Sequence, residues 1–145
     1  MPSALVSIEI VIGTLLTLVV VGLALVYVRR RYIARGMPLT LCGMREAGRD
    51  RWRLGLIRFG DNTLEWYSLG GVSVRAGRTW QRQLLLLDAP DRLEGSQGIT
   101  VLPDAFRVPC TEGEDHFELA LQGPDYTALR SWQEAAPPGY NVNVA

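Results

Sequence analysis

The residues of this chain whose types and spacing could do chemistry are, first of all, arginines. The 15 basic residues of the sequence include no lysine, so arginine carries every basic charge. Four arginines gather in one short stretch and offer forked N–H donors that suit a phosphate group: Arg45, Arg49, Arg51 and Arg53. Alternation along a strand would place the last three on one face. They are our candidate residues for binding a lipid headgroup or another phosphate.

The sequence leaves three uses of this cluster open. It could be a solvated face that adjoins an anionic membrane, a specific headgroup site, or a patch for a protein partner. Juxtamembrane arginine near anionic lipid is stabilised by roughly 1 kcal/mol per residue, so the first use needs no dedicated site.

Catalytic chemistry has weaker support. His116 is the only histidine and has acidic neighbours, but a lone histidine on the outer face of a strand is usually a surface residue. Cys42 and Cys110 form no C-x-x-C motif, which indicates neither a zinc site nor a redox site. The missing lysine excludes P-loop, Schiff-base and protein-kinase mechanisms. We therefore expect no catalytic residue, no metal and no cofactor, and predict that the chain is not an enzyme.

A membrane-spanning segment precedes these residues. Residues 10–28 carry no charge, and a bilayer core of about 30 Å needs about 20 such residues in a helix. Arginines crowd one end of the segment and form a basic juxtamembrane anchor over residues 29–36: Arg29, Arg30, Arg31 and Arg35. Basic clusters stay on the cytoplasmic side, so residues 1–9 are predicted outside and the rest inside.

The chain is thus predicted to be a single-pass plasma-membrane protein with its C-terminal domain at the inner leaflet. The alternative is a cleaved signal peptide, which would make the rest a secreted or envelope protein. Its n-region would lack positive charge, and its apolar run would be long.

The remaining domain, residues 37–136, has the period-two pattern of short strands separated by turns. The segments with this pattern are 39–42, 51–56, 64–69, 72–74, 80–87, 99–102, 105–110 and 116–121. In segment 51–56 we expect Trp52, Leu54 and Leu56 to face the core. The period then changes to that of a helix over residues 125–136, and we expect residues 137–145 to form a loose tail.

About seven short antiparallel strands tend to curl into a barrel or sandwich, and a single terminal helix can close its open side. This layout resembles the pleckstrin-homology superfold. The resemblance implies that residues 49–53 lie near the first hairpin, where lipid-binding members hold a basic headgroup site. Those members normally use lysine, which this chain lacks.

Charge is divided along the chain although the formal net charge is zero. Residues 29–82 carry 12 arginines against four acids, a net of +8, and residues 83–145 carry three against ten, a net of −7. This balance does not favour nucleic acid as a partner, and no small-molecule substrate is indicated. The partners indicated are the membrane, anionic lipid headgroups and an unidentified protein.

Four segments resemble those of a known family. They are Arg29-Arg30-Arg31 after the anchor, Trp52-Arg53-Leu54-Gly55, Leu64-Glu65-Trp66-Tyr67 and Leu129-Arg130-Ser131-Trp132. Over nearly its full length the chain resembles the actinobacterial domain-of-unknown-function family 2550. The resemblance implies a small single-pass protein of high-GC Gram-positive bacteria, often encoded near ATP synthase genes, and it implies no activity.

The function predicted from the sequence is a membrane-tethered, non-catalytic binding or scaffold module of unknown partner. The alternative is an accessory subunit of a larger membrane complex, linked to ATP synthase by gene neighbourhood only. An enzyme that uses His116 and nearby carboxylates ranks last.

Overall fold

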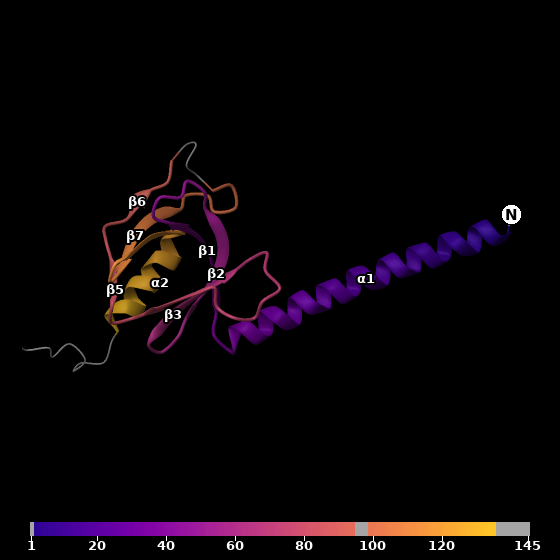
Figure 1. Cartoon of the computed structure of the whole chain (residues 1–145), viewed down its shortest axis with the longest axis horizontal. Coiled ribbons are helices and arrows are strands. Elements are labelled where there is room, and N and C mark those ends of the chain that lie inside the picture. The colour runs from indigo at the N-terminus through magenta and orange to yellow at the C-terminus, as the bar shows by residue number, and fades with distance from the viewer. Residues whose placement is uncertain (1, 95–98, 136–145) are drawn as a thin grey trace, which may run out of the picture. The chain divides into compact units, whose positions relative to one another are not determined.

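The protein is described here by a computed structural model in which residues 2–94 and 99–135 are placed (Figure 1). The chain divides into two compact units, Met1–Gly36 and Met37–Ala145, each of which is treated by itself. The predicted loose tail lies outside the described residues.

The first unit is a single helix, α1 (Pro2–Ala34), which contains the predicted span and extends it in both directions. Its 33 residues correspond to about 50 Å of helix, more than the bilayer core requires. The side-chain hydroxyls of Ser7, Thr14 and Thr17 donate to carbonyls four residues earlier at 2.8 Å, so they need no water. In the described part of the chain, α1 is the one helix long and apolar enough to cross a membrane.

The helix ends at a backbone reversal. Arg35 (φ 45°) and Gly36 (φ 83°) both adopt left-handed conformations, which glycine tolerates and arginine rarely adopts. Pro38 then restricts its neighbours before the first strand begins. The connection between the two units is therefore four residues long, 35–38, and conformationally restricted.

The second unit is an antiparallel sheet that curls almost into a barrel (Figure 1). Along the sheet the strand order is β4-β3-β2-β1-β8-β7-β5, with β6 paired to β7 off this path. The strands are β1 (Leu39–Glu46), β2 (Arg53–Phe59), β3 (Thr63–Ser68), β4 (Arg78–Gln81), β5 (Leu85–Leu87), β6 (Asp91–Arg92), β7 (Phe106–Glu112) and β8 (Asp115–Leu121). The predicted fold class, a long apolar helix followed by a mainly-β domain with one C-terminal helix, is confirmed.

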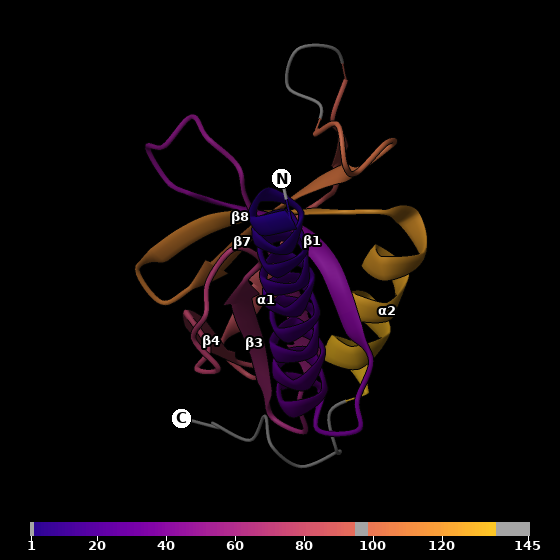
Figure 2. The same ribbon diagram turned by 90° about the vertical axis from the view of Figure 1, so that its right-hand side faces the viewer.

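That C-terminal helix, α2 (Gly123–Glu134), begins and ends two residues earlier than predicted. Leu129 is its fully buried residue and joins the core inside the barrel. The indole N–H of Trp132 donates to the Gly60 carbonyl, and the Gln133 amide donates to the Leu85 carbonyl, both at 2.6 Å. Figure 2 shows the helix along one side of the curled sheet. It therefore ties the β2–β3 turn to β5 and covers the barrel interior.

The barrel interior is lined by alternate residues of every long strand. Register pairs Cys42 with Gly55 and Gly55 with Ser68, so one ring of residues can be followed across three strands. Gly55 allows β2 to approach Trp66, because a Cβ at this position would lie 2.4 Å from the indole ring. The core cluster is Cys42, Met44, Ile57, Leu64, Trp66, Trp80, Leu85, Val108, Cys110, Phe117, Leu119, Leu121 and Leu129.

The predicted inward face of β2 is wrong. Ile57 and Phe59 face the interior, whereas Trp52 and Leu54 pack in a second apolar cluster on the outer face. That cluster is covered by the segment after β6: its buried members are Leu93, Leu102, Ala105 and Ala120. Leu54 and Leu56 point to one face of β2 and Ile57 points to the other, and all three are apolar. Alternation alone therefore could not decide which face of the strand lines the barrel interior.

Three predicted strands are also corrected. Residues 72–74 form no strand and lie in the β3–β4 loop, whose two ends are held by backbone hydrogen bonds. Segment 80–87 is two strands, because a turn at residues 82–84 carries the chain from one edge of the sheet to the other. Segment 99–102 forms only an isolated bridge.

Candidate functional site

The four clustered arginines do not converge on one site. Arg49 and Arg51 lie in the loop between β1 and β2, so the prediction that they share a strand face with Arg53 is wrong. Gly48 (φ 79°) and a bond from the Arg49 N–H to the Glu46 carbonyl (3.1 Å) reverse the chain before Arg51 is reached. This turn, which the residue spacing did not reveal, keeps Arg49 and Arg51 off the strand that carries Arg53.

The other two arginines lie on opposite faces of the sheet. Arg53 pairs in register with Met44, the residue before Arg45, so Arg45 points outward and Arg53 inward. The Arg45 guanidinium donates to Glu118 and lies 4.6 Å from the centre of the Trp52 ring. Its side chain is only 18% exposed, and it therefore ties β1 to β8 instead of offering a free cation.

The exposed positive charge of this arginine cluster lies in the loop between β1 and β2. Arg49 is exposed and pairs with Glu46 at 3.2 Å, while Arg51 is exposed and has no ion-pair partner among the described residues. Arg53 lies 5.3 Å from the Trp66 ring centre. Arg49 and Arg51 thus form a small basic tip on the first hairpin, and its role in lipid binding stays a prediction.

The juxtamembrane arginines are brought together by the helix itself. Arg29, Arg30 and Arg31 are consecutive in the last turns of α1, so their side chains point about 100° apart around its axis. Arg35 follows the helix and lies over the Tyr32 ring at 5.8 Å. Consecutive positions therefore spread three cations around the end of the helix.

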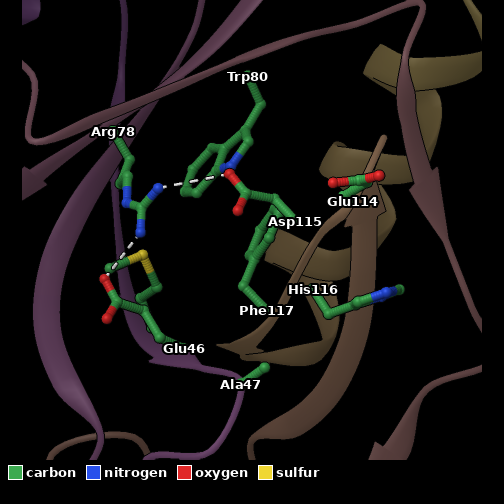
Figure 3. A pocket seen from close by; sticks show the side chains of 9 residues that line it. Glu46, Ala47, Arg78, Trp80, Glu114, Asp115, His116 and Phe117 are labelled. Carbon is green, nitrogen blue, oxygen red and sulfur yellow. Dashed lines mark hydrogen bonds and ion pairs between the residues drawn. The ribbon is translucent and has the colours of Figure 1, made fainter.

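A pocket opens at the end of the barrel (Figure 3). It has a volume of about 280 Å³ and is lined by β1, β4 and the β7–β8 hairpin. Its base is apolar, because the rings of Trp80 and Phe117 stack with centroids 4.3 Å apart and planes 12° from parallel. No single segment of the sequence contains this arrangement, and sequence reasoning missed it.

The polar rim of this pocket is an ion-pair network. Arg78 bridges β1 and β8: its guanidinium lies 3.0 Å from Glu46 Oε1 and 3.5 Å from Asp115 Oδ2 (Figure 3). The hydrogen bond from Arg78 is the main cause of a lowered pKa for the Glu46 carboxyl. The network ties three strands together at the open end and leaves Arg78 partly exposed to solvent.

The histidine faces away from these carboxylates. Strand alternation turns the Asp115 side chain toward the pocket and His116 outward (Figure 3). There the Nδ1 atom of His116 lies 3.2 Å from Thr111 Oγ1. Around this pocket His116 therefore does not face Glu46 or Asp115, and it shares the outer face of β8 with Glu118.

Both thiols are buried in the barrel core as free cysteines. Burial raises the pKa of Cys42 far above its ordinary value, and it raises the pKa of Cys110 to about 12. They are therefore thiols, not thiolates, at neutral pH and make poor nucleophiles. Within the described residues, no group of three or more histidine, cysteine, aspartate or glutamate side chains could hold a metal ion.

With this geometry established, comparison with known proteins decides the family. Residues 16–139 match the family described as a protein of unknown function, DUF2550. The chain belongs to this family. The match begins inside α1 and ends beyond α2, so it covers the apolar helix and the barrel together. No curated protein and no solved structure matches the chain significantly, and the resemblance to the pleckstrin-homology superfold stays a prediction.

Proposed function

We propose that this DUF2550 protein is a membrane-anchored, non-catalytic binding or scaffold module. In this proposal residues 10–28 cross the plasma membrane with the N-terminus outside, and the barrel is held at the cytoplasmic face. There it recruits a protein partner or contacts anionic lipid.

The observation that carries the proposal is α1. Its most apolar window is exposed throughout, its uncharged run is as long as a bilayer core requires, and its arginines gather at one end only. The positive-inside rule supports the proposed orientation. The connection 35–38 supports the tether, because only four residues join the barrel to the helix.

The use of the polar groups supports a non-catalytic role. Arg45 and Arg78 are ion-paired between strands, Cys42 and Cys110 are buried, and His116 faces outward. These groups hold the barrel together or lie apart from one another, and the exposed ones offer contacts instead of a reaction centre.

The test of the anchor is a topology measurement on the full chain. A fluorescent protein or alkaline phosphatase is fused after Ala145, and the membranes are extracted with alkaline carbonate. We expect fluorescence without phosphatase activity, and a fusion that resists extraction. Phosphatase activity would contradict the proposed orientation. Release of the fusion by carbonate would contradict the membrane anchor, and so would a mass spectrum that shows a cleaved N-terminus.

The test of the binding role is co-purification of the tagged full-length protein in mild detergent after crosslinking in cells. We expect a specific partner that is lost when surface residues of the barrel are changed. The alternative role, an accessory subunit, predicts instead that a whole membrane complex co-purifies. Recovery of the protein alone would count against both.

A further inference from the structure

The loop between β3 and β4, residues 69–77, exposes an unusual amount of apolar surface. Val72 is 96% exposed, and Leu69 and Val74 are 45% and 44% exposed. Single exposed apolar residues are normal on a protein surface, but a cluster of them indicates an interaction site. This cluster lies on one short loop and has no cover within the described residues.

The loop is held firmly at its base. The Leu69 N–H donates to the Leu54 carbonyl at 3.1 Å, and the Gly77 N–H donates to the Trp66 carbonyl at 2.8 Å. Gly77 also lies against the Trp66 ring, since a Cβ there would be 3.3 Å from it. The barrel therefore presents the tip around Val72 from a fixed base.

The charge of the loop suits an anionic surface. Residues 69–77 contain no acid and one base, Arg75, whose side chain is exposed and has no ion-pair partner among the described residues. The Arg75 N–H donates to the Ser73 hydroxyl at 3.1 Å, which shapes the turn after the tip. Valines beside an arginine match the interface of a bilayer, where apolar groups enter the acyl boundary and cations meet phosphate.

Within the barrel, the base of this loop lies on β3, two strands along the sheet from β1, the strand that follows the connection from α1. Register pairs Ser68 with Gly55 and Gly55 with Cys42, so the loop begins two strand spacings, about 10 Å, from a residue of β1. Cys42 is three residues after Leu39, the first residue of β1. The connection from the end of α1 to Leu39 can reach at most about 18 Å.

We propose that the loop of residues 69–77 inserts Val72, flanked by Leu69 and Val74, into the interface of the leaflet that α1 enters, with Arg75 on lipid phosphates. This rests on the proposed membrane anchor but not on its orientation, because either leaflet would serve. The barrel would then contact the bilayer at two places, the connection 35–38 and this loop, and its rotation about the anchor would be restricted.

The experiment uses a polarity-sensitive fluorophore on an introduced cysteine, Val72→Cys, in the full chain. The protein is reconstituted in vesicles of phosphatidylcholine and phosphatidylglycerol, with and without nitroxide-labelled lipid. Cys42 and Cys110 can stay, because their burial should keep them from reacting, and the unsubstituted protein measures any background. The matched control is Leu86→Cys on β5, where the side chain is 63% exposed and apolar.

We expect blue-shifted emission at position 72 that nitroxide lipid quenches at least twofold, and water-like, unquenched emission at position 86. Water-like emission at 72 in a chain that resists carbonate extraction would overturn the loop proposal alone. A blue shift without lipid quenching would also overturn it, because a protein surface would then cover the loop. A chain that carbonate releases from the vesicles would overturn the anchor as well.

Discussion

At the scale of residues, several arginines of the barrel tie strands together. Arg45 joins β1 to β8 through Glu118, and Arg78 joins β4 to β1 and β8 at the pocket. Arg58, only 6% exposed, pairs with Glu65 on the neighbouring strand. Arginine suits this work because its planar fork stays charged and matches a carboxylate. The number of arginines therefore overstates how much free positive charge the barrel offers.

The Arg78–Glu46 pair predicts a specific effect of pH. A carboxyl whose pKa is lowered in the folded state adds stability above its unfolded pKa, and this stability is lost as pH falls through the folded pKa. In Arg78→Gln the pKa of Glu46 should return toward its ordinary value, because the main cause of the shift is the Arg78 hydrogen bond. Glu46 should then contribute less to acid destabilisation.

The measurement is a titration of the Glu46 carboxyl carbon by NMR. The control is Arg130→Gln, which removes the exposed Arg130–Glu134 pair (3.3 Å) on α2 and should leave Glu46 unchanged. An unchanged Glu46 pKa in Arg78→Gln would show that the pair does not form in solution.

At the scale of elements, the helix α2 closes what the sheet leaves open. The sheet path ends at β4 and β5, and these two edges are not paired with each other in the described ladder. α2 bridges this region by hydrogen bonds to the Gly60 and Leu85 carbonyls and by the burial of Leu129. The helix is thus part of the barrel core, although its sequence reads only as an amphipathic segment.

This role predicts a large cost for truncating the buried residue of α2. Leu129→Ala should lower the free energy of unfolding by about 2–5 kcal/mol, because it removes buried methyl groups and leaves a cavity. The control Ser131→Ala, on the exposed side of the same helix, should change it by less than about 0.5 kcal/mol. Urea unfolding of the full chain in mild detergent, followed by tryptophan fluorescence, compares them; equal stability of the two variants would refute the assignment.

At the scale of the whole molecule, basic charge is concentrated where the chain leaves the apolar helix. Arg29, Arg30 and Arg31 end α1 and Arg35 follows it, whereas the described residues before the span carry no base. Cations also suit a helix C-terminus, whose backbone carbonyls are partly negative. This asymmetry is the feature from which the proposed orientation follows.

Removing the asymmetry should disturb the orientation. With glutamine at positions 29, 30, 31 and 35, a C-terminal alkaline phosphatase fusion should gain activity, because Arg45 alone would remain as a basic residue within the 15–20 or so positions after the span. The control replaces Arg49 and Arg51, which lie beyond the 15–20 or so residues whose charge sets topology. In that control the phosphatase should stay inactive. If the phosphatase were inactive in the four-glutamine variant as well, features other than these arginines would orient the helix.

The sequence by itself determined the elements whose signal is local. Residues 10–28 had to be helix in any apolar surrounding, because so long an uncharged run satisfies its backbone in no simpler way. The period-two segments and the final amphipathic segment were likewise enough to predict a curled antiparallel sheet with one helix. The family resemblance was also readable, because its short segments are contiguous in the chain.

The tertiary structure alone decided which residues meet. Leu54 and Ile57 are equally apolar, and only the packing of the segment after β6 made the face of Leu54 an outer cluster. Arg45 and Arg53 are close in sequence, yet the hairpin register sends them to opposite faces. The pocket joins Glu46, Arg78 and Asp115 from three strands. Such contacts depend on strand register and turn geometry, which are set by the packing of the whole barrel and not by neighbouring residues.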